Sequence, residues 1–280
     1  MMQALERGKI RRVVICLNAT HEGRATLELG GDLALALQAE IAALFVEDTD
    51  LFNLASLPFS REVLPAGGRS RNLDPMELGR AVAASKAQYR RLVEQTAERM
   101  RLAWAFESRR GSGLGDLSAY CTPDDLLVIG GWGRPFAPRL LIGPELDLAA
   151  IPANAIAFAS GAAPRALGAP VLAIGLKGPV RDDLLRLTAG LARQFAAPLR
   201  VMWLGDEGGA PASLPSGLPD DVKVQYEQIS DPDAEALQRR LRSLAPRLIV
   251  VDVGGEVAPG HDEALKLINR IDCPHLFIKQ

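Results

Sequence analysis

The stretch LLVIGGWGRPFAPRLLIG, residues 126–143, decides the fold. It begins with four apolar residues, a continuous run typical of a strand that is buried on both faces of a parallel sheet. Glycines follow the run at once, at positions 130, 131 and 133, and another stands at position 143. In open α/β folds, ligands bind at the carboxyl ends of the parallel strands. The stretch therefore predicts a parallel α/β domain with a ligand-binding loop after this strand.

Short apolar runs alternate with helical patterns on both sides of this strand. Apolar residues at helical spacing predict a helix over about residues 20–38. The sequence Asp74-Pro75-Met76-Glu77 predicts another helix start, with an acidic N-cap and a proline at the first helical position. Residues 47–73 are predicted to be a long irregular segment. The strands predicted for this half are 13–17, 41–46, 102–106, 125–130 and 153–159, with a short helix over about 114–120.

The same order of elements starts again at residue 170. The predicted strands are 170–174, 199–204, 222–229, 248–251 and 275–278, and the predicted helices are 180–195, 231–245 and 262–271. Residues 161–168, rich in Ala, Gly and Pro, form the natural boundary. Alternating strands and helices imply right-handed crossovers and a parallel sheet. We therefore predict two tandem α/β domains, residues 1–160 and 168–280, each a doubly wound, mainly parallel five-stranded sheet.

Composition excludes several classes of protein. The chain has 280 residues and a net charge of -2, which argues against a nucleic-acid-binding protein with a basic face. No apolar run approaches the roughly 18 residues of a membrane span, and the charged N-terminus does not resemble a signal peptide. The three cysteines, Cys16, Cys121 and Cys273, lack the spacing of a zinc or redox site. We expect reduced thiols in a cytoplasmic protein.

The glycine spacing after the strand points to phosphate binding. Two residues separate Gly130 from Gly133, and nine separate Gly133 from Gly143. Glycines let the backbone approach a phosphate and offer N–H groups to it, and the N-terminus of a following helix adds positive potential. Arg134 and Arg139 lie in the same loop and are candidate cationic donors.

With this spacing, and with the strand-like sequences at residues 43–47 and 171–174, the chain resembles the universal stress protein family in its tandem-domain form. The resemblance covers both halves in element order. It implies the adenine nucleotide alpha hydrolase-like fold and a bound adenine nucleotide, ATP or AMP. Asn18 and the backbone near Val46 would contact the nucleoside, and Gly130, Gly133, Arg134 and Gly143 the phosphates. It also implies that the fifth strands of the two halves meet near a pseudo-two-fold axis.

Three residues that differ from the family pattern bear on this site. Pro144 stands where the family has Ser or Thr, and proline has no N–H to give a phosphate. Glu145 adds a carboxylate that repels a phosphate. Asn18 replaces an acidic residue of the family, although an amide still hydrogen-bonds a ribose or a base. Two alternatives stay open: a nucleotide site that suits AMP better than ATP, or an inherited turn that holds no nucleotide.

The second half departs further from the pattern. Its fourth strand runs into Asp252-Val253-Gly254-Gly255, with no later glycine at the expected distance, and Lys177 stands where the family has an acid. We expect no phosphate binding in this half, which instead serves as the internal partner of the first.

The leading hypothesis for function is a non-enzymatic stress or regulatory protein that binds an adenine nucleotide. The alternative is a nucleotide-free scaffold that binds a protein partner through residues 51–64, an apolar segment expected to cover the ligand site or an interface. ATP hydrolysis is the least supported, since no residue stands out as a base or metal ligand. The adjacent Asp124 and Asp125 are interpreted as a solvated turn. The histidines, His21, His261 and His275, are scattered. Further homodimerisation of the chain is left open.

Overall fold

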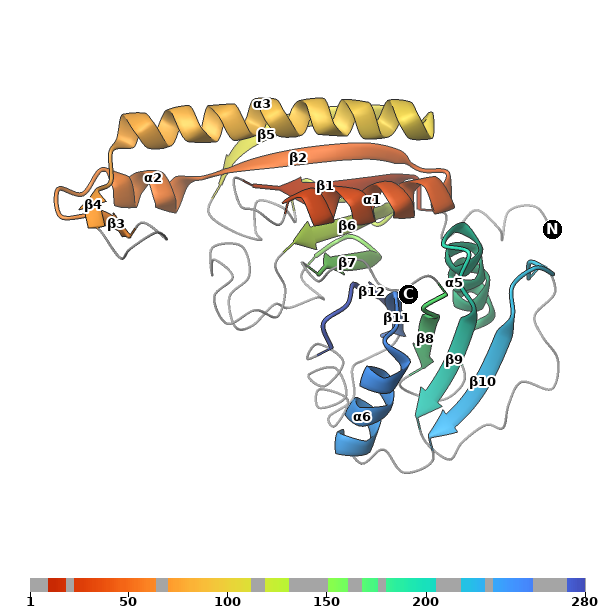
Figure 1. Ribbon diagram of the computed structural model, residues 1–280. Coiled ribbons are helices and arrows are strands. Elements are labelled where there is room, and N and C mark those ends of the chain that lie inside the picture. Colours follow the sequence, from red (N-terminus) through yellow and green to blue (C-terminus); the bar gives the residue numbers. More distant parts are fainter. Residues whose placement is uncertain are drawn as a thin grey trace.

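The computed structural model describes residues 10–18, 23–63, 70–111, 119–130, 151–160, 168–175, 180–204, 218–229, 234–253 and 271–279. Their strands form one ten-stranded sheet, in the order β10-β9-β8-β11-β12-β7-β6-β1-β2-β5, and a separate two-stranded hairpin, β3–β4 (Figure 1). Neighbouring strands of the large sheet run parallel except at its centre, where β7 and β12 are antiparallel.

Each half of the sheet has the same strand order. The first half is β5-β2-β1-β6-β7, with β1 at Arg12–Leu17, β2 at Glu40–Asp48, β5 at Trp104–Gly111, β6 at Asp125–Gly130 and β7 at Ala155–Ala159. The second half is β10-β9-β8-β11-β12, with β8 at Val171–Gly175, β9 at Leu199–Leu204, β10 at Val224–Ile229, β11 at Leu248–Asp252 and β12 at His275–Ile278. The predicted fold class, with two mainly parallel five-stranded units, is confirmed.

The central strands are unbroken apolar runs because both of their faces are covered. Consecutive residues Val13, Val14 and Ile15 are all fully buried, although their side chains point to opposite faces. Helices α1 (Gly23–Leu37), α3 (Pro75–Met100) and α5 (Asp182–Gln194) contribute to the core on one face. Helix α6 (Ala234–Leu244) packs on the other.

The longest described helix, α3, begins where its sequence predicts. The Asp74 carboxylate accepts a hydrogen bond from the Met76 backbone N–H at 2.9 Å, and Pro75 occupies the first turn, where its missing N–H costs nothing. At the other end, Arg101 takes the left-handed conformation, with φ of 56°, and stops the helix.

The two halves are joined by an antiparallel strand pair. β7 and β12, the fifth strand of each half, pair with Ala157 opposite Leu276. Phe158 and Phe277 add an edge-to-face contact across this seam, with 5.7 Å between ring centroids. The expectation that the fifth strands meet is therefore confirmed, and the pairing merges two sheets into one.

The segment predicted to be irregular, residues 47–73, is largely ordered, so that prediction was wrong. β2 continues to Asp48, whose carboxylate caps the short helix α2 (Thr49–Ala55) by accepting from the backbone N–H groups of Asp50 and Leu51. The hairpin follows, with β3 at Arg61–Val63 and β4 at Ser70–Asn72. Local side-chain capping, which apolar periodicity does not report, creates this helix.

The halves differ in the length of the connection after their second strand. In the first half, residues 49–103, with α2, the hairpin and α3, lie between β2 and β5, whereas the shorter segment 205–223 joins β9 to β10. In the second half, α6 lies between β10 and β11. Figure 1 shows the consequence: α3 and α2 extend past the end of the sheet and carry the β3–β4 hairpin away from the second half.

Candidate functional site

Three of the predicted site residues lie at one edge of the first half. Asn18 directly follows β1, Val46 lies near the end of β2, and Gly130 ends β6. β1 is the neighbour of both other strands, and its register places Leu17 beside Phe45 and Cys16 beside Ile129. Asn18, Val46 and Gly130 are thus the next residues along three adjacent strands, at the carboxyl edge of the sheet.

The three positions differ in burial, and therefore in which of their atoms can contact a ligand. The Val46 side chain is buried in the core, so any ligand contact here falls to its backbone. Asn18 and Gly130 are half-buried. The remaining predicted residues, Gly133, Arg134 and Gly143, lie outside the described residues. The same holds for Arg139, Pro144, Glu145 and His21.

A charged cluster beside this edge was missed by the sequence analysis. The Glu47 carboxylate accepts from Lys86 Nζ at 2.6 Å, from Ser108 Oγ at 2.9 Å and from Arg110 Nε at 3.3 Å. The hydrogen bond from Lys86 is the main cause that holds the pKa of Glu47 below its usual value. Glu47 is therefore ionised and bound to cations at neutral pH, which leaves it unsuited to act as a base.

The Glu47 cluster joins elements that are distant in the sequence. Lys86 comes from α3, whereas Ser108 and Arg110 come from β5. The Arg110 guanidinium also lies over the ring of Phe52 in α2, 5.9 Å from its centroid. The cluster thus fixes α2 and α3 to the carboxyl edge of the sheet. No sequence motif links these residues, and only the tertiary structure brings them together.

The equivalent edge of the second half carries an ion pair. Val13 of β1 pairs with Leu126 of β6, and Val171 of β8 pairs with Leu248 of β11. When the halves are aligned with Val13 on Val171, Asp252 falls at the position of Gly130. The Asp252 carboxylate accepts from Arg181 Nε at 3.0 Å. A side chain and its cation thus occupy the position at which the first half begins its glycine loop.

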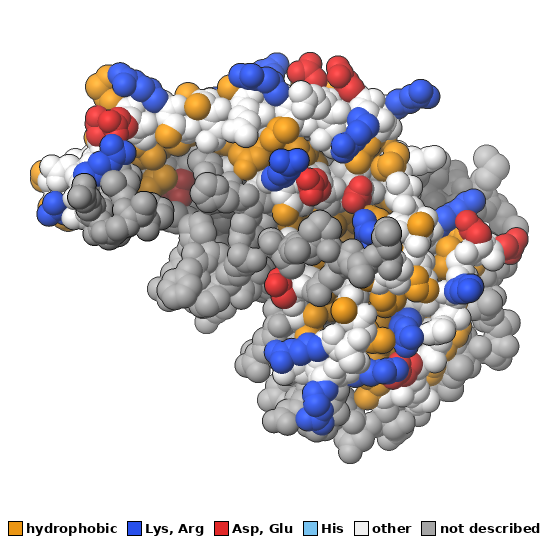
Figure 2. Space-filling view, in the orientation of Figure 1, with side chains coloured by type: hydrophobic (Ala, Val, Ile, Leu, Met, Phe, Trp, Pro, Cys, Tyr) orange, Lys and Arg blue, Asp and Glu red, His pale blue; other side chains and the backbone are white. Residues whose placement is uncertain are grey.

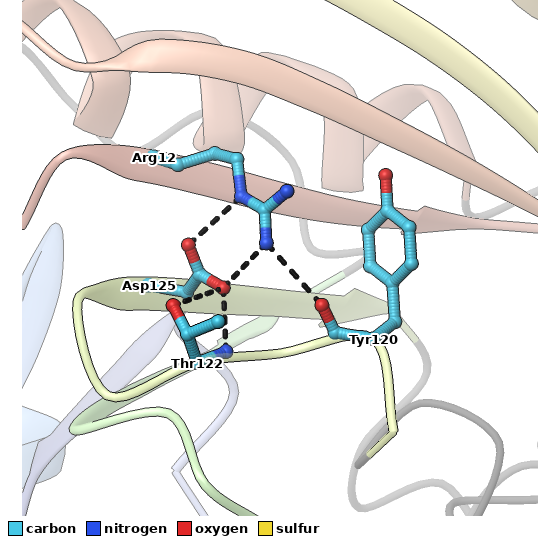
Figure 3. A network of polar contacts seen from close by, with 4 residues as sticks. All are labelled: Arg12, Tyr120, Thr122 and Asp125. Carbon is cyan, nitrogen blue, oxygen red and sulfur yellow. Dashed lines mark hydrogen bonds and ion pairs between the residues drawn. The ribbon is translucent and has the colours of Figure 1, made fainter.

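The opposite, amino-terminal edge of the first half holds a second polar network (Figure 3). Arg12 donates two hydrogen bonds to the Asp125 carboxylate, from Nε at 2.9 Å and from Nη2 at 2.7 Å, and it also donates to the Tyr120 carbonyl. The Thr122 backbone N–H and hydroxyl both donate to the same carboxylate. The Tyr120 ring lies between the guanidinium groups of Arg12 and Arg109, with centroid distances of 5.2 and 4.9 Å.

This network corrects the interpretation of Asp124 and Asp125 as a solvated turn. Asp125 is only 2% exposed, whereas the side chain of Asp124 is largely in solvent. Burial alone raises the pKa of Asp125, but the hydrogen bonds from Arg12 and Thr122 outweigh it and hold the pKa below its usual value. A carboxylate so fully bonded acts as a structural anchor and is not available for acid–base chemistry.

The cysteines offer no reactive thiol at this site. All three are buried, and none forms a disulfide bond. Burial raises the pKa of Cys16 and of Cys121 to about 12, so both are protonated at neutral pH. Within the described ranges, no three acidic, His or Cys side chains gather as a metal site would require. None of the helices described above has the length and apolar character needed to span a membrane.

Comparisons with known proteins identify the fold. No family model matches the chain, and no curated protein matches its sequence. A universal stress protein structure from Archaeoglobus fulgidus DSM 4304 aligns with a TM-score of 0.58 at 13% identity, covering 97% of each chain. A putative universal stress protein from Pseudomonas aeruginosa UCBPP-PA14 aligns with a TM-score of 0.54 at 14% identity, covering 96% of this chain and 93% of that one. Over nearly its whole length, the chain has the fold of these proteins.

Proposed function

We propose that this chain, which has the fold of the universal stress proteins, is a cytoplasmic regulatory protein of the stress-response type that holds an adenine nucleotide in its first half alone. The observation that carries the proposal is the convergence of Asn18, Val46 and Gly130 on adjacent strands. They lie at the edge where α/β sheets bind ligands, and the glycine-spaced loop starts at this point in the sequence.

Each residue has a role that its chemistry suits. The Asn18 amide donates to and accepts from a ribose or an adenine, and the backbone at Val46 is the remaining contact for the base. Gly133 and Gly143 give backbone N–H groups to the phosphates, with Arg134 as the cation. Pro144 and Glu145 remove a donor and add a negative charge, so AMP suits the site better than ATP.

The proposed role is binding without catalysis. Two carboxylates of the first half, Glu47 beside the carboxyl edge and Asp125 at the amino edge, are both held by cations, and the pKa of each is lowered. A general base needs a pKa near the working pH, and the pKa of each of these carboxyl groups is shifted away from neutral pH. A bound nucleotide then acts by stabilising one state of the protein, as a ligand-controlled regulator does.

The second half supports the restriction to one site. A phosphate at the position of Asp252 meets a carboxylate, and the Arg181 cation that could attract it is already paired.

Isothermal titration calorimetry with ATP, ADP and AMP tests the proposal. We expect one binding site per chain, with AMP bound most tightly. Asn18→Ala should weaken binding about tenfold, or about 1.4 kcal/mol, because one polar contact is lost. Gly133→Val should abolish binding, because a branched side chain blocks the approach of the phosphate. Asp252→Ala is the matched control in the second half and should leave the affinity unchanged.

Three outcomes contradict the proposal. If no nucleotide gives heat of binding, the glycine loop is an inherited turn that holds no nucleotide, and the nucleotide-free scaffold is favoured. Two sites per chain contradict the restriction to the first half. Phosphate release that survives stringent purification and disappears in Gly133→Val establishes an ATP hydrolase instead.

A further inference from the structure

We propose that the chain associates with a second copy of itself through the apolar tip of its arm. The arm is the extension formed by α2, the β3–β4 hairpin and the start of α3 (Figure 1). Within the described part of the chain, every large apolar side chain that is well exposed lies on this arm: Leu54 at 49%, Leu57 at 41%, Phe59 at 75% and Met76 at 67%. Such gathering of exposed apolar groups marks an interaction surface.

Hydrogen bonds within the chain order the turn at the tip. Ser60 Oγ donates to the Leu54 carbonyl at 2.6 Å, and the Leu73 backbone N–H donates to the Ser60 carbonyl at 3.0 Å. These bonds tie the turn after α2 to the strand that leads into α3. Because they fix the backbone next to Phe59, less ordering of the chain is needed when a partner covers this side chain.

Charges around the tip favour a second copy over an anionic surface. The arm carries Arg61 and Arg71 as well as Asp50, Asp74 and Glu77, and Arg71 pairs with Glu77 at 3.0 Å. Figure 2 shows side chains of both signs around the orange ones at this end of the molecule. Lipid headgroups and nucleic acids require an excess of cations. A surface that carries both signs is complementary to itself across a two-fold axis.

The hairpin gives such a contact a backbone component. Among the described residues, β3 and β4 pair only with each other, over three residues each. A two-stranded sheet of this length is marginal in water, and its free edges accept further strands. Two copies related by a two-fold axis can join their hairpins edge to edge while Phe59 and Met76 cover one another. The central seam is not available for this, because β7 and β12 are already paired within the chain.

Sedimentation equilibrium over a concentration series tests this interface on the full chain. We expect a monomer–dimer equilibrium in the wild type. Phe59→Asp and Met76→Asp should each weaken dimerisation at least tenfold, because both place a charge in the apolar contact. Gln225→Asp on the exposed edge strand β10 is the control and should dimerise as the wild type does. All four proteins should show the same circular dichroism, since the substituted side chains are in solvent.

Disulfide trapping adds a positional measurement. The native cysteines are all buried, so an introduced surface cysteine is the reactive one. Phe59→Cys should form a covalent dimer under mild oxidation, and Gln225→Cys should not. The proposal is overturned by a wild type that stays monomeric at the highest concentrations. A dimer that resists both Asp variants, or a monomer that co-sediments with lipid vesicles, also overturns it.

Discussion

The first and second halves of this molecule share a strand order but differ in the length of their connections. In the first half, residues 49–103, with α2, the hairpin and α3, join β2 to β5, whereas the shorter segment 205–223 joins β9 to β10 in the second. The second half has α6 between β10 and β11. The same strand order is thus compatible with connections of very different length. The strands define the fold, and the connections are free to take on separate tasks.

The two halves also differ in the residues at their carboxyl and amino edges. At the carboxyl edge, Gly130 of the first half corresponds to Asp252 of the second. At the amino edge, the same alignment matches Asp125 with Arg247, whose guanidinium lies over the Phe195 ring, 4.7 Å from its centroid. The first half therefore has an anchor at its amino edge and a glycine at its carboxyl edge, whereas the second half has an ion pair at its carboxyl edge.

Removing the anchor of the first half should have the largest effect. Asp125→Ala leaves Arg12 and the Thr122 N–H without their partner in a site from which water is largely excluded. We expect the free energy of unfolding in urea to fall by about 3 kcal/mol. The exposed neighbour provides the control: Asp124→Ala should change it by less than about 0.5 kcal/mol. Equal effects of the two variants would contradict the contrast between buried anchor and solvated turn.

The pH dependence of stability gives the anchor a second readout. The pKa of Asp125 is lowered in the folded state, so its contribution is fully present above the unfolded value of about 3.9. The contribution is lost as the pH falls through the lower folded value. The difference in stability between wild type and Asp125→Ala should be constant near neutral pH and shrink below about pH 4. A difference that stays constant into strong acid would exclude the ion pair as its cause.

The first helix of each half contains a glycine whose substitution by alanine should change stability, and the two changes should have opposite signs. A Cβ on Gly30 of α1 would lie 2.5 Å from Ile15 Cδ1 and 2.6 Å from its Cγ1, whereas a Cβ on Gly190 of α5 meets nothing within 4 Å. Gly30→Ala should cost about 2 kcal/mol by overpacking. Gly190→Ala should stabilise by about 0.5 kcal/mol through helix propensity. Thermal unfolding of both variants measures this, and two changes of one sign would show that the helices pack alike.

Removing the Asp252–Arg181 ion pair of the second half should lower stability less than removing the Asp125 anchor of the first half. Asp252→Ala removes the acceptor of Arg181, which is half-buried and able to reach water, so we expect a loss of about 1 kcal/mol. Asp221→Ala breaks an equally short pair with Arg193 that is well exposed, and should cost less than about 0.5 kcal/mol. Chemical denaturation compares the two. A loss as large as that of Asp125→Ala would make the halves equivalent in their anchoring.

Much of the fold was predictable from local pattern. Apolar runs placed the eight inner strands of the main sheet to within two residues, because a strand buried on both faces must be continuously apolar. The edge strand β5 is only partly apolar and continues five residues past its predicted end at residue 106. The start of α3 followed from Asp74 and Pro75, which act within one turn. Of the candidate site, the carboxyl-edge placement of Asn18, Val46 and Gly130 also followed from strand order.

The sequence by itself therefore determined the repeated order of strands and helices along the chain and the position of the glycine loop, since both depend on neighbours along the chain. Only the tertiary structure decided which polar groups are buried and which apolar groups are not. Arg12 and Asp125 are 113 residues apart, and Glu47 and Lys86 are 39 apart. Phe59 looks as apolar as any core residue, yet it lies at the tip of an arm. Burial is a property of contacts between distant segments, and no local pattern records it.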